Sequence, residues 1–202
     1  MISILIVDDI NIIRVGTKRL LDDVDGFEVI ATAESGEAAI RLVNRYHPDV
    51  ILMDVSMPGM GGIEATKRLK RAHPDLPIII LSVLNNPPTQ NHLLNAGASG
   101  YLHKDCPVEE IVEAIRAVHE GEHYLGSDCS MVFSENTPID ELSEREFQVL
   151  QMLVNGQKIK DISESLSLSP KTISTYRARL LEKLHVSNDA ELARFAMQYG
   201  LI

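Results

Sequence analysis

The sequence lacks tryptophan and is poor in aromatic residues, with five tyrosines and four phenylalanines among 202 residues. Apolar residues still make up 45% of the chain, so a packed core must be mainly aliphatic. No stretch approaches the run of about 18 or more apolar residues that spans a membrane. The N-terminal MISILIVDDI has no basic segment before its short apolar run, which argues against a secretory signal. We therefore expect no membrane partner.

Cysteine is also scarce, and its placement disfavours two classes of protein. Cys106 and Cys129 are the only cysteines, with no metal-binding spacing and no cluster of histidines and cysteines around them. A disulfide-stapled secreted domain and a cysteine-ligated zinc module are therefore both poor interpretations. Free thiols in a cytoplasmic protein are the simpler one.

The net charge of −10 is distributed unevenly along the chain. Residues 1–140 carry 11 Lys/Arg against 21 Asp/Glu, whereas residues 141–202 carry 8 of each. Within 158–184, six basic residues stand against three acidic ones. The acidic surplus belongs to the first part and a local basic surface to the second, which indicates two modules with different partners.

The first 120 residues alternate short apolar runs with amphipathic segments. The expected strands are Ser3–Val7, Phe27–Ala33, Val50–Met53, Ile78–Ser82 and Gly100–Leu102. The expected helices cover residues 11–22, 36–46, 62–72, 88–96 and 107–120. Runs this apolar suit strands that are covered on both faces. Five strand–helix units in a row predict an α/β fold with a doubly wound, five-stranded parallel sheet.

The rest of the chain changes character. Residues 122–141 are polar and interrupted by Gly126 and Pro138, which predicts a linker. After it come helical patterns separated by very short turns, near residues 143–155, 158–166, 170–184 and 188–199. We therefore expect one domain over 1–121 and a second, small all-α domain of four helices over 142–202.

Polar side chains follow the ends of several predicted strands. Asp8 and Asp9 follow the first strand, Asp54 follows the third, Ser82 ends the fourth, and Lys104 follows the fifth. The carboxyl ends of parallel strands share one edge of a sheet, so these side chains should converge there. Clustered carboxylates need a cation, and their hard oxygens favour Mg²⁺. A carboxylate in such a pocket can attack phosphorus, while the ammonium and the hydroxyl contact the phosphoryl oxygens. Each residue alone could be a helix cap or a surface charge; their joint placement favours a site.

Four motifs in this part resemble those of two-component response-regulator receiver domains, which have a flavodoxin-like fold. The motifs are LIVDD at 5–9, LMDVSMPGMGG at 52–62, ILS at 80–82 and GYLHK at 100–104. The resemblance implies that Asp54 is the phosphoacceptor and that Mg²⁺ is bound by Asp8, Asp9, Asp54 and the Ser56 backbone carbonyl. It also implies that Ser82 is the switch hydroxyl, Tyr101 the switch aromatic and Lys104 the pocket lysine. Val83 and Ile10 depart from the common pattern, which puts the kinetics of phosphorylation in question.

The basic segment of the second part resembles a DNA-binding module. Ser169-Pro170 is a strong helix start, because serine caps a helix and proline fits its first turn. One side of the following helix is apolar, and the other mixes small, polar and basic residues that suit a major groove. An ordinary amphipathic surface helix is the alternative. However, LSEREFQVL at 142–150 and IKDISESLSLSPKTISTYRARLLEKL at 159–184 resemble LuxR-type helix-turn-helix domains.

Together the two resemblances imply a regulator of the NarL/FixJ class, whose recognition helix is Pro170–Leu184 and whose last helix forms a homodimer contact. The implied DNA-binding residues are Lys171, Ser174, Thr175, Arg177, Ala178, Arg179 and Lys183. SPKTISTYRARLLEKL followed by DAELARFA is most similar to the GacA/UvrY/LetA group. That group implies a BarA/GacS-like hybrid sensor histidine kinase as partner and promoters of small RNAs that act on CsrA/RsmA as targets.

Three functions remain open from the sequence. The first is a phosphorylation-dependent transcription factor. Such a protein is not an enzyme, and its only reactions are self-phosphorylation and slow autodephosphorylation. The second is an aspartyl-phosphate phosphatase, disfavoured because Ser56 stands where a second acid is usual two residues after the nucleophile. The third is a pseudo-receiver that mediates protein contacts, which only Val83 and Ile10 support.

Overall fold

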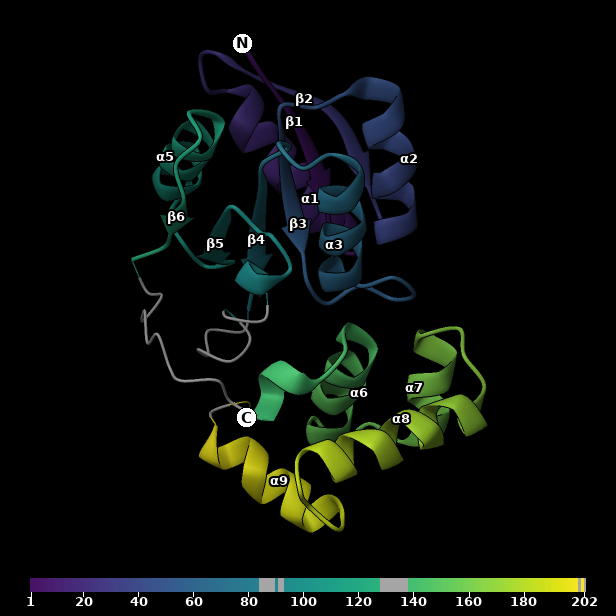
Figure 1. Cartoon of the computed structure of the whole chain (residues 1–202). Helices are drawn as coiled ribbons and strands as arrows, with labels where there is room; N and C mark the ends of the chain where they lie inside the picture. The colour runs from purple at the N-terminus through teal and green to yellow at the C-terminus, as the bar shows by residue number, and fades with distance from the viewer. Residues whose placement is uncertain (84–89, 91–92, 128–137, 200, 202) are drawn as a thin grey trace. The chain divides into compact units, whose positions relative to one another are not determined.

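The computed structural model of the chain describes residues 1–83, 90, 93–127, 138–199 and 201 (Figure 1). These residues form two compact units, one holding nearly all described residues up to 127 and the other those from 138 onward. Within the described residues, no helix is long and apolar enough to cross a membrane.

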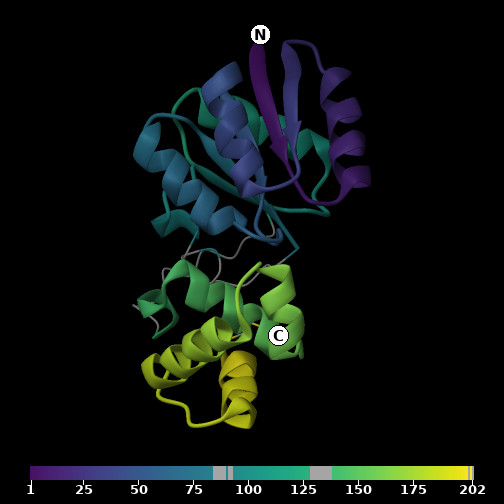
Figure 2. The same cartoon turned by 90° about the vertical axis from the view of Figure 1, so that its right-hand side faces the viewer.

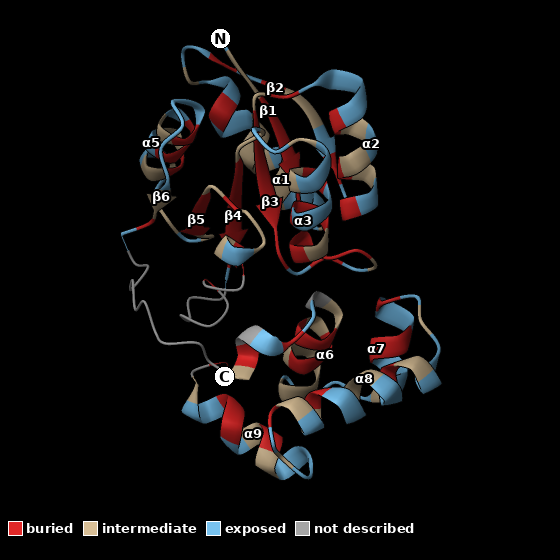
Figure 3. Ribbon diagram, in the orientation of Figure 1, coloured by how far each residue is buried: buried red, intermediate tan, exposed pale blue. Residues whose placement is uncertain are grey.

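The first unit is built on a parallel sheet with strand order β2-β1-β3-β4-β5-β6. The strands are β1 (Ile2–Val7), β2 (Phe27–Ala33), β3 (Val50–Asp54), β4 (Ile78–Ser82), β5 (Gly100–His103) and β6 (Tyr124–Leu125). β3 and β4 are buried along their whole length, as the near-continuous apolar sequence predicts (Figure 3). The chain order changes direction at β1, which lies between β2 and β3, so a crevice forms at the carboxyl ends of β1 and β3.

Helices cover both faces of this sheet (Figure 2). They are α1 (Asn11–Asp22), α2 (Gly36–Tyr46), α3 (Gly62–Ala72) and α5 (Val108–His119). Leu21 of α1 and Ile115 of α5 share one apolar cluster with residues of β1, β3 and β4. Ala39 of α2 and Leu69 of α3 are also buried, and α2 and α3 pack against each other. The prediction of an α/β unit with a doubly wound parallel sheet is confirmed.

The predicted element bounds agree closely with the structure, with one difference in strand number. The sheet has six strands rather than five, because Tyr124–Leu125 pairs in parallel with β5 inside the predicted linker. The Tyr124 N–H donates to the Ser99 carbonyl at 3.1 Å, and the Gly126 N–H donates to the Tyr101 carbonyl at 2.9 Å. A two-residue strand in a polar stretch has no alternating pattern to reveal it. Of the predicted helix over 88–96, residues 88, 89, 91 and 92 lie outside the described residues, and residues 90 and 93–95 are helical.

The second unit contains a short 3₁₀ helix η1 (Pro138–Glu141), then α6 (Glu144–Val154), α7 (Ile159–Ser165), α8 (Pro170–Lys183) and α9 (Asp189–Gln198). Side-chain caps start three of these helices: Ser143 for α6, Ser169 for α8 and Asn188 for α9. The Glu146 side chain accepts from the Ser143 N–H, which completes a capping box. α8 packs against both α6 and α7, so its inner side is held by two helices and its outer side is exposed. The predicted four-helix unit is confirmed.

Candidate functional sites: an acidic pocket and a basic helix

The three predicted aspartates meet at the carboxyl ends of β1 and β3. Asp8 and Asp9 follow β1, and Asp54 is the last residue of β3. A carboxylate oxygen from each lies within 4.8 Å of the others. Asp8 is 3% exposed and Asp54 is 4% exposed. Two nearly buried carboxylates so close together need compensating positive charge.

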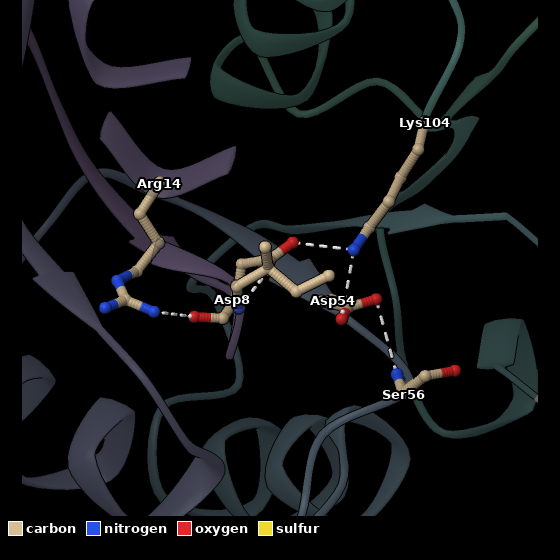
Figure 4. Close-up of polar contacts among 6 residues, drawn as sticks. Asp8, Arg14, Asp54, Ser56 and Lys104 are labelled. Atoms are coloured by element: carbon tan, nitrogen blue, oxygen red, sulfur yellow. Dashed lines mark hydrogen bonds and ion pairs between the residues drawn. The ribbon is translucent and has the colours of Figure 1, made fainter. Parts of the chain in front are cut away.

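Lys104 supplies part of that charge from the end of β5 (Figure 4). Its Nζ lies 2.6 Å from Asp8 Oδ2 and 3.0 Å from Asp54 Oδ2, so one ammonium bridges two carboxylates. Backbone donors hold the other oxygens: the Ile10 N–H donates to Asp8 Oδ1 at 2.8 Å, and the Ser56 N–H donates to Asp54 Oδ1 at 3.3 Å.

The protonation equilibria reflect burial as well as charge. Burial raises the pKa of Asp54 above its ordinary value, an effect that the Lys104 ammonium opposes and the Asp8 carboxylate reinforces. Burial acts to lower the pKa of Lys104, but the hydrogen bonds and charges of Asp8 and Asp54 outweigh it and raise that pKa. The ammonium is therefore charged, and Asp54 is a more basic carboxylate than one in water.

The donor set suits a divalent cation. Asp8, Asp9 and Asp54 offer three carboxylates, and Lys104 offers one ammonium, which leaves two negative charges in the pocket. A dication balances that charge, and carboxylate oxygens are the ligands that Mg²⁺ prefers. Receiver domains generally bind Mg²⁺ at such a cluster. The part of the Ser56 carbonyl as a ligand stays a prediction.

The loop after β3 is shaped by features that sequence reasoning missed. The Gly62 N–H, at the start of α3, donates to the Val55 carbonyl at 3.0 Å. A Cβ on Gly62 would lie 2.0 Å from the Asp54 carbonyl oxygen, so only glycine allows α3 to begin there. At the other side of the loop, Glu37 Oε1 accepts from the Met60 N–H at 3.0 Å. The adjacent glycines 61 and 62 were the only signal in the sequence for this close approach.

The predicted switch residues are both buried. Ser82 is 1% exposed at the end of β4, and Tyr101 is fully buried in β5. Val83, by contrast, is 60% exposed. Ile10 is 47% exposed beside the pocket.

The second site is the outer side of α8. Five of the predicted DNA-binding residues are exposed there: Lys171, Ser174, Thr175, Ala178 and Arg179. Ile173 and Leu180 are buried on the inner side. The Ser174 hydroxyl donates to the Pro170 carbonyl and the Thr175 hydroxyl to the Lys171 carbonyl, so both short side chains lie close to the helix backbone.

The other two predicted DNA-binding residues, Arg177 and Lys183, instead pair with side chains inside the unit. Arg177 pairs with Asp189 of α9, with 2.7 Å between Nη2 and Oδ1. Lys183 Nζ lies 2.7 Å from Glu146 Oε2 and donates to the Glu141 carbonyl at 3.0 Å. Within the described residues, no ion pair holds Lys171 or Arg179. The guanidinium of Arg179 and the ammonium of Lys171 are therefore better placed for an external anion than those of Arg177 and Lys183.

A parallel α/β unit with an acidic pocket, followed by a helical unit with a basic outer helix, defines a response regulator that carries its own DNA-binding domain. Two family models agree: "Response regulator receiver domain" matches residues 4–116, and "Bacterial regulatory proteins, luxR family" matches residues 140–196. The chain belongs to the two-component response regulators of the NarL/FixJ class and is most like the GacA/UvrY/LetA group.

Curated relatives support the narrower group. Response regulator GacA of Pseudomonas viridiflava is 43% identical over 210 residues, which cover 100% of this chain and 98% of that protein. Response regulator UvrY of Escherichia coli (strain K12) is 43% identical over 209 residues, covering 100% and 96%. Among solved structures, the response regulator RcsB–DNA complex matches with a TM-score of 0.63 and 28% identity, covering 97% of this chain and 98% of that chain.

Proposed function

We propose that this protein accepts a phosphoryl group on Asp54 from a sensor histidine kinase and regulates transcription by binding promoter DNA. The observation that carries the proposal is the placement of Asp54, a nearly buried carboxylate beside Asp8 and Asp9 and 3.0 Å from the Lys104 ammonium. Repelling acids in a low-dielectric pocket are costly to fold, which is why such clusters mark functional sites.

The reaction is a transfer between two side chains. A carboxylate oxygen of Asp54 attacks the phosphorus of a phosphohistidine, the O–P bond forms, the N–P bond breaks, and the imidazole leaves with the electron pair of that bond. Lys104 balances charge on the phosphoryl oxygens, and the Ser82 hydroxyl donates to one of them. When bound by Asp8, Asp9, Asp54 and the Ser56 carbonyl, Mg²⁺ supplies further charge neutralisation at those oxygens.

The protein is a switch and not a turnover enzyme. Ser56 occupies the position two residues after Asp54, and a hydroxyl there is too weak an acid or base to activate water efficiently. Hydrolysis of the acyl phosphate is accordingly slow. A small phosphate ester that the protein hydrolysed over many turnovers would contradict this part of the proposal.

The output is DNA binding by α8 in the major groove. Ser174, Thr175 and Ala178 approach base edges, while Lys171 and Arg179 contact phosphates. The RcsB–DNA complex among the similar structures supports this use of the fold. A homodimer joined through α9 would read two half-sites, as helix-turn-helix dimers do.

The relatives support a narrower proposal. Similarity to GacA and UvrY over the full chain favours promoters of small RNAs that act on CsrA/RsmA, and a BarA/GacS-like hybrid kinase as phosphoryl donor. Such a regulator works in the cytoplasm, where the chromosome and the kinase domain are accessible. Sequencing the DNA that the phosphorylated protein binds in cells tests this: a few small-RNA promoters should be recovered.

The acceptor itself is tested by labelling the full chain with acetyl phosphate and Mg²⁺. We expect about one hydroxylamine-sensitive phosphoryl group per chain, and none in Asp54→Asn, because the amide is a far weaker nucleophile. Asp105→Asn is the matched control, since that carboxylate is 88% exposed and lies next to Lys104 without joining the pocket. Full labelling of Asp54→Asn would disprove the assignment.

A further inference from the structure

His103 is the last residue of β5 and immediately precedes Lys104. Its ring contacts the backbone on two sides. Nδ1 accepts from the Asp105 N–H at 3.2 Å, and Nε2 lies 3.1 Å from the Val83 carbonyl oxygen. A carbonyl only accepts and a backbone N–H only donates, so these two contacts require a neutral ring with its proton on Nε2.

These contacts connect the two segments that carry pocket side chains. Ser82 pairs in register with His103, and the Lys104 N–H donates to the Ser82 carbonyl at 2.9 Å. The β4–β5 ladder ends there. The His103 ring continues the connection by one residue, because it reaches the carbonyl of Val83, which follows Ser82. The segment after the switch hydroxyl is thereby tied to the strand end that presents Lys104.

The Val83 carbonyl faces the His103 ring, and Val83 itself is 60% exposed. The His103 side chain is 21% exposed, and both of its hydrogen bonds lie at the protein surface. The Asp105 carboxylate, 3.7 Å from Nδ1, is 88% exposed and makes no hydrogen bond to the neutral ring, because Nδ1 carries no proton.

We propose that His103 is a positioning residue for phosphoryl transfer, which acts by holding the Ser82–Val83 segment against the strand end that presents Lys104. The proposal rests on the proposed function of Asp54. Both Ser82 and Lys104 must contact the same phosphoryl group, so their separation has to be kept within a fraction of an ångström. A hydrogen bond across the gap between their segments restricts that separation before the phosphoryl group arrives.

The two contacts of the ring can be separated by substitution. The side-chain amide of Gln reaches the position of Nε2 and can donate to the Val83 carbonyl, whereas that of Asn reaches only the position of Nδ1 and can accept from the Asp105 N–H. Leu fills similar space and makes neither bond. The full-length wild type, His103→Gln, His103→Asn and His103→Leu are compared for the rate of labelling by acetyl phosphate and for Mg²⁺ affinity.

We expect His103→Leu and His103→Asn to be labelled about fivefold more slowly than the wild type, and His103→Gln to be within about twofold, because only Gln keeps the bond to Val83. Mg²⁺ affinity should be unchanged in all three, since Asp8, Asp9 and Asp54 are untouched. Equal rates in all four proteins would overturn the proposal. Equal losses in all three variants, or a parallel loss of Mg²⁺ affinity, would also overturn it by indicating a general structural effect.

A second measurement does not depend on phosphorylation. Long-range ¹H–¹⁵N spectra of the full chain, with the His103 signal assigned from its disappearance in His103→Gln, should show the ring proton on Nε2 at neutral pH. A proton on Nδ1 would overturn the proposed contacts. If the wild type is not labelled at all, the proposed function of Asp54 is wrong. If the wild type is labelled and the His103 variants are labelled at the same rate, only the proposed role of His103 is wrong.

Discussion

The backbone of α3 begins so close to Asp54 that one methyl group there should disturb the pocket. Gly62→Ala would place a Cβ 2.0 Å from the Asp54 carbonyl oxygen, a rigid backbone atom that cannot rotate away. We expect this substitution to lower the free energy of unfolding by about 1–3 kcal/mol, as overpacking does, and to weaken Mg²⁺ binding. Chemical denaturation and Mg²⁺ titration of the full chain measure both.

Gly16→Ala is the matched control, because Gly16 lies within α1 and a Cβ added there would meet no neighbouring element within 4 Å. Alanine is a better helix former, so stability should rise by about 0.5–1 kcal/mol. If Gly62→Ala were as harmless as Gly16→Ala, the close approach of α3 to Asp54 would be wrong.

Glu146 carries a pH dependence in the second unit. Burial acts to raise its pKa, but the Lys183 ammonium and the Ser143 backbone N–H outweigh burial and hold the pKa below the ordinary value of 4.5. A lowered folded-state pKa means that the stabilisation is complete above pH 4.5 and is lost as the pH falls through the folded-state value. We expect the stability gap between the wild type and Glu146→Gln to close in that acidic range.

The same contact can be tested without unfolding. In Lys183→Met, the pKa of Glu146 measured by carbon-detected NMR titration should rise, because the ion pair at 2.7 Å is lost while burial remains. An unchanged pKa in that variant would show that Lys183 does not hold Glu146.

At the scale of elements, the basic residues of α8 are of two kinds, those exposed to solvent and those paired within the unit. Arg179 is exposed on the outer side, whereas Arg177 is paired with Asp189 of α9. We expect Arg179→Ala to weaken binding to specific and unrelated DNA alike, and to reduce the slope of log affinity against log salt by about one. Arg177→Ala should leave that slope nearly unchanged. Fluorescence anisotropy at several salt concentrations measures it, and equal slopes for both variants would contradict the division.

β6 and the loop after β3 show why some elements escape prediction. The long strands are recognisable because apolar residues repeat along them, and the helices because their apolar residues recur at helical spacing. β6 has two residues, and its existence depends on the free edge of β5 rather than on its own sequence. Glu37 likewise accepts a hydrogen bond from the Met60 N–H only because α2 lies beside the loop that holds Met60.

At the scale of the whole molecule, the two units have separate apolar cores. One is centred on β1, β3 and β4, and the other on Phe147, Ile162 and Leu180. We expect two transitions in the calorimetric unfolding of the full chain. Gly62→Ala should lower only one of them, and Lys183→Met only the other. A single transition that shifts in both variants would contradict this expectation.

The sequence by itself determined the two kinds of domain, nearly all strand and helix bounds, and which side chains gather at the carboxyl edge of the sheet. These depend on periodicity, capping residues and the rule that parallel strands end at one edge, all of which act over a few residues. Only the tertiary structure decided how the gathered side chains are paired. Lys104 bridges Asp8 and Asp54, His103 contacts the Val83 carbonyl, and Lys183 forms an ion pair with Glu146. Each of these contacts joins residues far apart in the chain, and such pairings depend on how packed elements place two backbones side by side.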